Sequence, residues 1–591
     1  MKRKVLLLAA FLFSLFFFHF SRINAQSWLW GNYGIGDATV WSVGVDRNGN
    51  CYLSGLFPND TLQFGSNNLM NSTITNAPYS SNFDAFIVKL NPQGKVLWAK
   101  QTVTKNSIDT LGNFEPCTVA TDNKGNVYLN SNFPDTLFVG SNTLTAKGFQ
   151  NTCVTKYDAF GNVLWAKQST GKNNLSTVAG ASTSCDNHGN VFVSGAFADT
   201  VNFGSFTIIG TSPMYYYNSF LVKYDSNGNV KWTKQSVYLG DYSNDLSYGV
   251  INDRFGNAFI TGVYIDSISF GSFKLTGGNP NFYLVKYDAN GNIIWAKQNA
   301  EINGGSSAGI SLVTDQPGNI YATGQFAGKI VFGQDTLIAP PSLGSFFLVK
   351  YDSNGNVLWA KQATILDNNT WNAWGLSIDN YKHLYLSVNG GYQQCKVGFG
   401  GDTLSMYDTA KYDGASLIFK LDSNGNTLCS SIVPVGALGG VENGIASDTS
   451  GNYVYFGAAL ATPVIFGKDT INPFAYPINK IQEGNYFPFA ARWEACDSNA
   501  LTTSVLEQKP IGQVTLYPNP NAGSFTIVLQ NINEPTQMEI YNVLGEEIYK
   551  TKLNFNNAQL NLGSQPEGIY FYRVLSENGG FIGSGKLIIE K

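Results

Sequence analysis

The sequence predicts an all-β chain, in which a large domain of repeated strands precedes a small β-sandwich. The composition combines 62 glycines and 14% aromatic residues with only 13% charged residues, which favours short strands and tight turns over long helices. One strand-and-turn motif returns along most of the chain. At 591 residues the chain is too long for a single ordinary core, so several domains or a repeat array are expected.

Residues 1–25 have the order of a secretory signal peptide. Lys2, Arg3 and Lys4 precede an apolar run at 5–20, and cleavage is expected after Ala25. The alternative is a membrane anchor, but the run of 16 residues is shorter than the ~20 that a spanning helix needs. Cleavage leaves 33 basic against 41 acidic residues, a net charge of −8, which makes nucleic acid an unfavourable partner.

The first half of the repeat is Asp-x-x-Gly-Asn followed by an alternating strand. Its copies start at 46, 122, 186, 253, 315, 379 and 448, and a Phe-Gly or Val-Gly pair follows at 64, 139, 203, 270, 332, 399 and 466. The copy at 379 departs most, with Lys382-His383 where Gly-Asn would stand. Period-two alternation after a Gly turn predicts two antiparallel strands in each copy.

The second half of the repeat is a hairpin such as "YDSNGNVLWAKQ" at 351–362. Near-copies stand at 157–168, 224–235 and 287–298, with a looser one at 90–101. Its second strand is marked by Trp98, Trp165, Trp232, Trp295 and Trp359, with Cys429 in the sixth place. The Gly supplies the positive φ of the turn, and Trp359 is expected to pack between neighbouring units. A calcium loop is the alternative, but the Gly comes too early and no Glu completes it.

The last strand of the array is missing at its end and present at its beginning, as "SWLWGN" around Trp30. A ring of four-stranded blades leaves no open edges if one terminus supplies that strand, whereas a linear solenoid would need capping repeats. Residues 26–496 are therefore predicted to be a seven-bladed β-propeller, closed by the mature N-terminal strand. They resemble the family of seven-bladed β-propeller repeat proteins, whose unit carries Asp-x-x-Gly-Asn-Val-Tyr-Val-Thr-Gly.

The tail contains a polar linker at 497–513, and strand-like runs at 514–591 that predict a small Ig-like antiparallel sandwich. It resembles the type A C-terminal sorting domain of the type IX secretion system. The residues that carry this resemblance are Tyr517, Pro518, Asn519, Pro520, Gly523, Tyr541, Asn542, Gly545, Gly568, Tyr570, Lys586 and Lys591.

The resemblance implies Sec export, passage through the type IX translocon, and removal of the tail by a sortase-like peptidase. The product is then attached to surface lipopolysaccharide or released, so a secreted or outer-surface location is expected. The alternative is an ordinary Ig-like accessory domain.

An Asp-Thr/Ser-aliphatic triplet also recurs near each Phe-Gly pair. One interpretation is an Asx or Ser/Thr turn at a hairpin end. The triplet also resembles the O-glycosylation acceptor of Bacteroidota, and the hydroxyl residues concerned are Thr61, Thr136, Thr200, Ser267, Thr336, Thr403 and Thr470.

Little in the sequence indicates catalysis. The mature chain has only His188 and His383, and the odd number of cysteines, seven, includes no CxxC spacing and is expected to lie mostly in buried strands. The five residues before each repeat Asp carry no charge. Paired carboxylates would have to come from Glu115, Asp245 and Glu442 on the rim. No catalytic residue, metal or cofactor is expected, and the alternative is a secreted glycan-active enzyme.

A non-catalytic binding or adhesion module is the favoured prediction. The repeat turns lie on one face, and the loops of the other face vary, as functional loops on rigid scaffolds do. The candidates for contact with a glycan or protein ligand are Tyr215, Tyr216, Tyr217, Tyr238, Tyr242, Trp371 and Trp374. The loops at 213–218 and 238–245 are expected to emerge side by side. In the alternative, these rings only pack the loops onto the rim.

Overall fold

The structure is a computed structural model with two compact units, one at Gln26–Leu501 and one that includes Thr502–Lys591. It describes residues 27–591 apart from 59–60, 72–82, 106–115, 211–215, 240–244, 341, 368, 391–393, 408–414, 434–443, 461–463, 467–468, 472–486, 497–512, 531–535, 543–545, 554–556 and 577–580. The expected signal peptide and nearly all of the linker lie outside these residues. The described part contains no helix long and apolar enough to cross a membrane.

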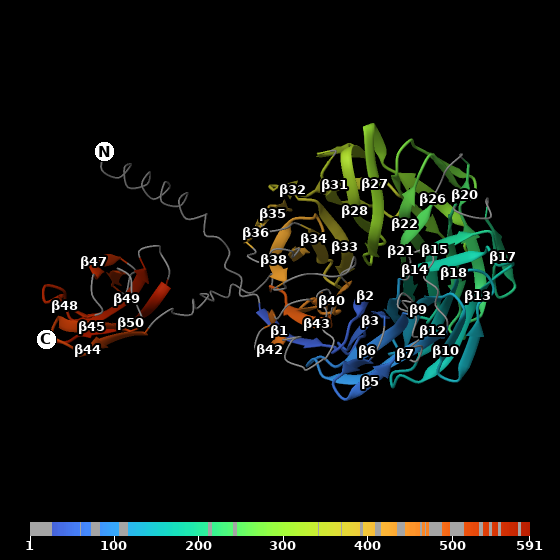
Figure 1. Cartoon of the computed structure of the whole chain (residues 1–591). Helices are drawn as coiled ribbons and strands as arrows, with labels where there is room; N and C mark the ends of the chain where they lie inside the picture. Colours follow the sequence, from blue (N-terminus) through green and yellow to red (C-terminus); the bar gives the residue numbers. More distant parts are fainter. Residues whose placement is uncertain are drawn as a thin grey trace. The chain divides into compact units, whose positions relative to one another are not determined.

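The larger unit consists of antiparallel sheets that follow one another along the chain (Figure 1). The successive four-strand groups are β2 (Thr39–Val45), β3 (Cys51–Phe57), β6 (Asp84–Leu90), β7 (Val96–Lys105); β8 (Thr118–Thr121), β9 (Val127–Phe133), β12 (Asn151–Tyr157), β13 (Val163–Gly171); β14 (Thr177–Cys185), β15 (Val191–Ala198), β18 (Asn218–Tyr224), β19 (Val230–Gln235); β21 (Leu246–Asn252), β22 (Ala258–Tyr264), β25 (Asn281–Tyr287), β26 (Ile293–Gln298); β27 (Ala300–Thr314), β28 (Ile320–Phe332), β30 (Ser345–Tyr351), β31 (Val357–Gln362); and β33 (Trp371–Ile378), β34 (Leu384–Gly390), β37 (Ala415–Leu421), β38 (Thr427–Val433). Small four-stranded antiparallel sheets of this kind are consistent with propeller blades.

The first and last strands of the larger unit share a sheet. The strand β1 (Ser27–Tyr33) pairs antiparallel with β43 (Phe487–Glu494), which pairs with β40 (Tyr453–Leu460) and through it with β39 (Gly444–Ser447). Figure 1 shows the blue β1 beside the orange β43. Asp448 lies in the turn between β39 and β40. The strand pairing expected for residues 27–31 is thus present.

The Asp-x-x-Gly-Asn motif is a turn built around its carboxylate. Oδ1 of Asp46 accepts hydrogen bonds from the backbone N–H of Asn48 and Asn50, both at 2.9 Å. Its Oδ2 accepts from the Asn50 side chain at 2.8 Å and from the Tyr52 hydroxyl at 3.0 Å. Gly49 has a φ of +73°, which favours glycine. The motif therefore repeats because every residue of it has a role in the turn.

The outer hairpin repeats because its turn contacts the preceding sheet. A Cβ added to Gly161 would lie 2.9 Å from Trp98. The Trp98 indole and the buried Lys89 ammonium both donate to the carbonyl of Ala159 in that turn, each at 3.1 Å. Lys89 also lies 5.1 Å from the centroid of the Tyr52 ring. A Cβ added to Gly425 would likewise lie 2.9 Å from Trp359, so the expected packing of Trp359 between neighbouring repeat units is confirmed.

The last residue of the outer hairpin is a Gln, and its side chain is hydrogen-bonded to a smaller hairpin that is inserted between the second and third strands of the same sheet. Gln362 donates to the carbonyl of Ile338 and accepts from its N–H, at 2.8 and 2.6 Å. These insertions are β4 (Thr61–Phe64) with β5 (Asn67–Met70), β10 (Thr136–Val139) with β11 (Asn142–Thr145), β16 (Thr200–Phe203) with β17 (Phe206–Ile209), β23 (Ser267–Phe270) with β24 (Phe273–Thr276), the end of β28 with β29 (Asp335–Ala339), β35 (Gln394–Phe399) with β36 (Asp402–Tyr407), and β41 (Val464–Phe466) with β42 (Asp469–Ile471). The outer strand of one sheet continues into the insertion of the next, as in β7–β10 and β13–β16.

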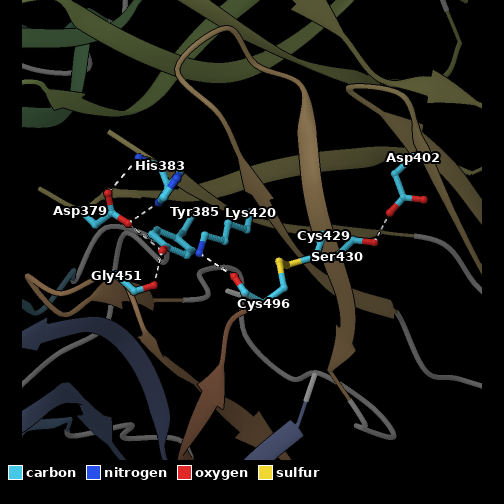
Figure 2. Close-up of a disulfide and its surroundings, with 9 residues drawn as sticks. All are labelled: Asp379, His383, Tyr385, Asp402, Lys420, Cys429, Ser430, Gly451 and Cys496. Carbon is cyan, nitrogen blue, oxygen red and sulfur yellow. Dashed lines mark hydrogen bonds and ion pairs between the residues drawn. A yellow bond between two sulfur atoms is a disulfide. The ribbon is translucent and has the colours of Figure 1, made fainter. Parts of the chain in front are cut away.

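A disulfide joins the last two sheets where other units have a Trp. Cys429 on β38 is bonded to Cys496, 67 residues later, at the end of the larger unit (Figure 2). The Lys420 ammonium donates to the Cys496 carbonyl at 2.9 Å, as Lys89 does to Ala159. Cys117 and Cys153 are buried and unpaired, and burial raises the pKa of each thiol to about 12.

The smaller unit is the expected sandwich of two antiparallel sheets. One sheet contains β44 (Gln513–Tyr517), β45 (Ser524–Gln530) and β48 (Asn557–Asn561), and the other β47 (Glu547–Leu553), β46 (Thr536–Tyr541), β49 (Gly568–Ser576) and β50 (Phe581–Ile589). Alternate residues such as Ile527, Met538 and Leu587 are fully buried and form its core.

Candidate functional site

Five innermost strands of the larger unit, β2, β14, β21, β27 and β33, carry a β-bulge at the same repeat position. The extra residue stands five places before the repeat Asp, and the residues are Trp41, Ala181, Tyr248, Ile310 and Trp374. A bulge breaks the in-and-out alternation of a strand and redirects one side chain. At this position the chain places residues that range from Ala to Trp, while the turn residues around it repeat.

The bulged side chains meet around one hollow. All five line a cavity of about 140 Å³, together with residues that include Thr118, Ser182 and Ser311. Among the described lining residues none is charged. The cavity therefore combines aromatic and aliphatic side chains with hydroxyls, and the polar part of its exposed surface is the larger.

Hydrogen bonds fix the hydroxyls of this cavity. Ser182 Oγ accepts from the N–H of Val250 at 3.1 Å, and Ser311 Oγ accepts from the N–H of Leu376 at 3.3 Å. Each bond links the inner strands of neighbouring sheets. Because each oxygen acts as an acceptor here, its own hydrogen is left to be donated toward a ligand.

The two indoles of the cavity differ in their polar contacts. Trp374 Nε1 donates to Oδ1 of Asn389, which fixes the ring. Trp41 Nε1 is buried and has no hydrogen-bond partner among the described residues. Sequence reasoning missed Trp41 and Tyr248. The signal that could have found them is the variation of the residue five places before each repeat Asp, the first of the five uncharged residues.

The tyrosines predicted on the variable face lie elsewhere. The backbone N–H of Asp245 donates to the carbonyl of Tyr217 at 3.1 Å, so the two loops meet as expected. Tyr216 and Tyr217 are half-buried, and burial raises the pKa of Tyr217. Tyr238 is half-buried in β20 (Val237–Tyr238), which pairs with β23. Tyr215 and Tyr242 lie outside the described residues, and the structure does not place the other three in the cavity lining.

The expectation that Trp371 contacts a ligand is wrong. Its side chain is 0% exposed and packs in a hydrophobic core with Phe346 and Leu417, and its indole donates to Asp367. Trp374, three residues later, lines the cavity instead. The two residues therefore do not form one patch, because Trp371 faces the core and Trp374 is redirected by the bulge.

The hydroxyl residues predicted to be O-glycosylation acceptors divide into two groups by exposure. Thr61, Thr336 and Thr403 are exposed, whereas Thr136, Thr200 and Ser267 are half-buried. The hydroxyl of Thr136 donates to Asp135 at 3.1 Å, which is the turn chemistry of the simpler interpretation. Thr470 belongs to β42, and its side chain lies outside the description.

The titratable groups that a hydrolase would need do not gather in the described part of the chain. Asp245 is 0% exposed, and Glu115 and Glu442 lie outside the described residues. His383 is bonded to Asp379 at 2.9 Å in its repeat turn (Figure 2). No group of three or more His, Cys, Asp or Glu that could hold a metal occurs within the described ranges.

The sorting motif of the smaller unit has an exposed part. Asn519 donates to the carbonyl of Lys586 at 2.6 Å and accepts from the N–H of Ile588 at 2.8 Å, which joins its segment to β50. The side chains of Tyr517, Pro518, Pro520 and Lys586 are exposed there, Tyr517 at 52%.

Other residues of the motif are structural. Tyr570 is buried and its hydroxyl donates to Pro566 at 2.8 Å, while the Lys591 N–H donates to Glu567. Gly568 begins β49, and Gly545 lies outside the described residues. The motif therefore combines residues that form the fold with a small exposed surface around Tyr517 and Lys586.

Curated relatives match the chain in part. An uncharacterized WD repeat-containing protein of Acanthamoeba polyphaga mimivirus is 24% identical over 530 residues, 74% of this chain and 36% of that protein. The endo-acting ulvan lyase of Formosa agariphila is 36% identical over 83 residues, and ulvan lyase NLR42 of Nonlabens ulvanivorans 33% over 89. The two matches cover 14% and 15% of this chain and 14% and 16% of the lyases. The chain thus spans about a third of the viral relative's length and about a seventh of each lyase's.

Solved structures show likeness at low identity. A fungal alcohol oxidase of the AA5 family in complex with copper has a TM-score of 0.35 at 13% identity, covering 96% of this chain and 100% of that chain. PorZ, a surface component of the type IX secretion system of Porphyromonas gingivalis, has a TM-score of 0.15 at 11% identity, covering 95% and 100%. At these scores neither likeness defines how the strands are arranged.

The family comparison concerns the tail. Residues 515–590 match the family described as the secretion system C-terminal sorting domain. This range coincides with the smaller unit and with all the motif residues from Tyr517 to Lys586. The chain is therefore a β-rich repeat protein with a sorting domain at its C-terminal end, which implies export through the type IX secretion system.

Proposed function

We propose that residues 26–496 form a closed seven-bladed propeller in which β1 completes the last blade. The contact of Trp98 with the next unit has a counterpart across the chain ends. The Trp30 indole donates to the carbonyl of Pro92 at 2.9 Å, and a Cβ on Gly94 would lie 2.7 Å from Trp30.

A second recurring bond also spans the chain ends. The Tyr128 hydroxyl donates to the Gly189 carbonyl of the next unit at 3.2 Å, and the Tyr455 hydroxyl donates to Gly49 near the N-terminus at 2.8 Å. The same kinds of contact that join neighbouring repeat units of the larger unit thus join its last repeat unit to its first. A closed ring leaves no unpaired sheet edges, which is the usual protection against edge-to-edge association.

The propeller, in this proposal, binds a ligand at the exterior of the cell and performs no chemistry on it. The observation that carries this is the cavity lined by the bulge residues. The residue at the bulge position varies between repeats whose turn residues stay constant. The described lining residues include no carboxylate, histidine, lysine or cysteine, and their only titratable side chain is Tyr248. A site made of rings and hydroxyls suits recognition, because general acid–base catalysis needs a titratable group within reach of the substrate.

The sorting domain delivers this module. We assign contact with the type IX translocon to the exposed side chains of Tyr517, Pro518, Pro520, Lys586 and Lys591, because Asn519 and Tyr570 are hydrogen-bonded within the fold. A sortase-like peptidase then removes the tail, and the propeller is attached to surface lipopolysaccharide or released. The exposed Thr61, Thr336 and Thr403 are the acceptors that O-glycosylation would reach first.

The glycan-active enzyme is the less supported alternative. The lyase activity in the relatives' names belongs to proteins that share only 83 and 89 residues with this chain. Of the rim carboxylates, Asp245 is fully buried. A lyase or hydrolase would need paired acid and base groups beside the substrate, and Tyr248 is the only titratable side chain among the described lining residues of the cavity.

Two measurements test the proposed function. In a bacterium that has the type IX system, the variant without residues 514–591 should accumulate as a folded domain in the periplasm, whereas Leu97→Ala, on the outer surface of a blade, should be displayed normally. Surface display of the truncated chain would contradict the sorting assignment. The purified propeller should bind glycans or surface proteins in a screen without shortening any polysaccharide, and product formation would instead indicate an enzyme.

A further inference from the structure

The bulge cavity can be assigned a ligand class from its chemistry, an assignment that rests on the proposed binding function. The lining residues include three aromatic rings, from Trp41, Tyr248 and Trp374. Flat rings stack on the apolar faces of sugar rings, and hydroxyls beside them recognise the sugar hydroxyls. Ser182 and Ser311 also line the cavity, and because their oxygens accept from backbone N–H groups, their O–H groups can donate to a ligand.

The uncharged character of the described lining residues restricts the ligand further. No lysine, arginine or histidine is among the described residues that line the cavity. A uronate or sulfate group would lose its hydration there without gaining a cationic partner, which is unfavourable. The cavity therefore suits an uncharged sugar and opposes an acidic one.

The volume limits the ligand to one small unit. At about 140 Å³ the cavity is smaller than the ~300–1,000 Å³ typical of sites for drug-sized molecules. A single sugar ring at the end of a glycan matches this size better than a stretch of polysaccharide does.

From these observations we propose that the bulge cavity binds the terminal residue of a neutral glycan. Trp374, fixed by Asn389, provides the main stacking surface. Tyr248 and Trp41 flank the sugar, and Ser182 and Ser311 donate to its hydroxyls. The repeat scaffold holds these groups in place before the ligand arrives, since the bulges and the Ser bonds are part of the sheet structure.

The test uses the mature full-length chain and methyl glycosides as probes. Methyl glycosides of glucose, galactose, mannose and N-acetylglucosamine are titrated beside methyl glucuronide and galactose 6-sulfate, with binding followed by ligand-observed NMR. At least one neutral glycoside should bind at least tenfold more tightly than both charged probes. Binding of the glucuronide or the sulfated sugar at equal strength, or of no neutral glycoside at all, would overturn the assignment.

Variants separate this cavity from other sites. Trp374→Ala and Tyr248→Ala should each weaken binding at least tenfold, whereas Tyr248→Phe keeps its ring and should lose less than threefold. Leu358→Ala on the exposed outer strand is the matched control and should leave affinity unchanged, and thermal unfolding checks that each variant folds. A neutral glycan that binds equally to the wild type and to Trp374→Ala would leave the binding function standing but overturn this cavity as its site.

Discussion

The outer hairpin turns of the larger unit keep the same residues from repeat to repeat, whereas the residues at the inner bulges vary. In the hairpin turns, Gly161, Gly228, Gly291 and Gly355 are all followed by Asn, and a Cβ on any of them would press on a Trp or Lys of the preceding unit. At the bulges the chain places Trp, Ala, Tyr or Ile. The turn residue is determined by a contact with a neighbouring unit, whereas the bulge residue faces a cavity.

This difference teaches where to look for function in a repeat protein. A position that stays constant among copies within one chain is explained by packing and hydrogen bonds, as the bonds of Asp46 and Lys89 show. A position that varies on a constant scaffold is not needed for folding. The four experiments below test this distinction, beginning with the largest expected effect.

Removal of residues 27–33 should destabilise the larger unit most. The deletion exposes the edge of β43, including the fully buried Trp493, and removes the Trp30 contact with Gly94. The loss of a whole strand and its core contacts should cost more than about 5 kcal/mol and broaden the denaturant transition. Equilibrium unfolding in guanidinium measures it, and an unchanged midpoint and slope would show that the ring is not closed by β1.

Loss of the disulfide should have the next largest effect. The double variant Cys429→Ser with Cys496→Ser frees a loop of 67 residues, for which the chain-entropy relation gives about 4 kcal/mol. The wild type in reductant should show the same loss under chemical denaturation. Cys185→Ser is the control, because Cys185 is unpaired. Equal stability of the oxidised and reduced proteins would mean that the junction does not depend on the bond.

Asp84 should make stability depend on pH. Burial raises its pKa from 3.8 to about 7, and its Oδ2 has no partner among the described residues. Because the folded state holds this proton more tightly than the unfolded state, stability should fall as pH rises from about 4 to 7 and then level off. At ~1.4 kcal/mol per pKa unit, the fall is at most about 4 kcal/mol.

Other repeats of the chain indicate which substitution of Asp84 the fold should accept. Asn151, Asn218 and Asn281 stand at the position of Asp84 in the strand pairing. Asp84→Asn should keep the bond from the Thr104 N–H, remove most of this pH dependence and stabilise the protein at pH 8. Unfolding curves of both proteins at pH 5 and 8 provide the comparison, and an unaltered slope with pH would rule out Asp84 as its source.

Much of the fold could be predicted from the sequence because the repeat encodes it locally. Turn residues, alternation and the Trp marker specify strands in each unit, and Trp30 located the displaced strand at the N-terminus. The disulfide could not be predicted. Cys429 was recognised at the Trp position. Its pairing could not be predicted, because only the structure shows that Cys496 lies where the other repeat units place the hairpin turn that contacts the Trp.

The cavity could not be predicted because a bulge leaves no signature in composition. Strand alternation alone assigns each inner residue to a face, and one inserted residue reverses that assignment from Trp374 onward. Trp371 was misplaced for a different reason. It was taken for a loop aromatic, but it begins the inner strand β33 and packs in the core. The sorting motif, by contrast, was readable because its residues lie close together in the sequence.

The most direct test of the account compares Gly355→Ala and Ile310→Ala, two single changes within one unit. Gly355 has a φ of +81°, and a Cβ there would lie 2.7 Å from Lys297 and 3.0 Å from Trp295, so its substitution should cost about 2 kcal/mol. Ile310→Ala places at a bulge the residue that Ala181 already provides in another unit, and it should cost less than about 1 kcal/mol. Denaturant unfolding of both variants should give this order, and a larger loss for Ile310→Ala would contradict the division between constant scaffold and variable site.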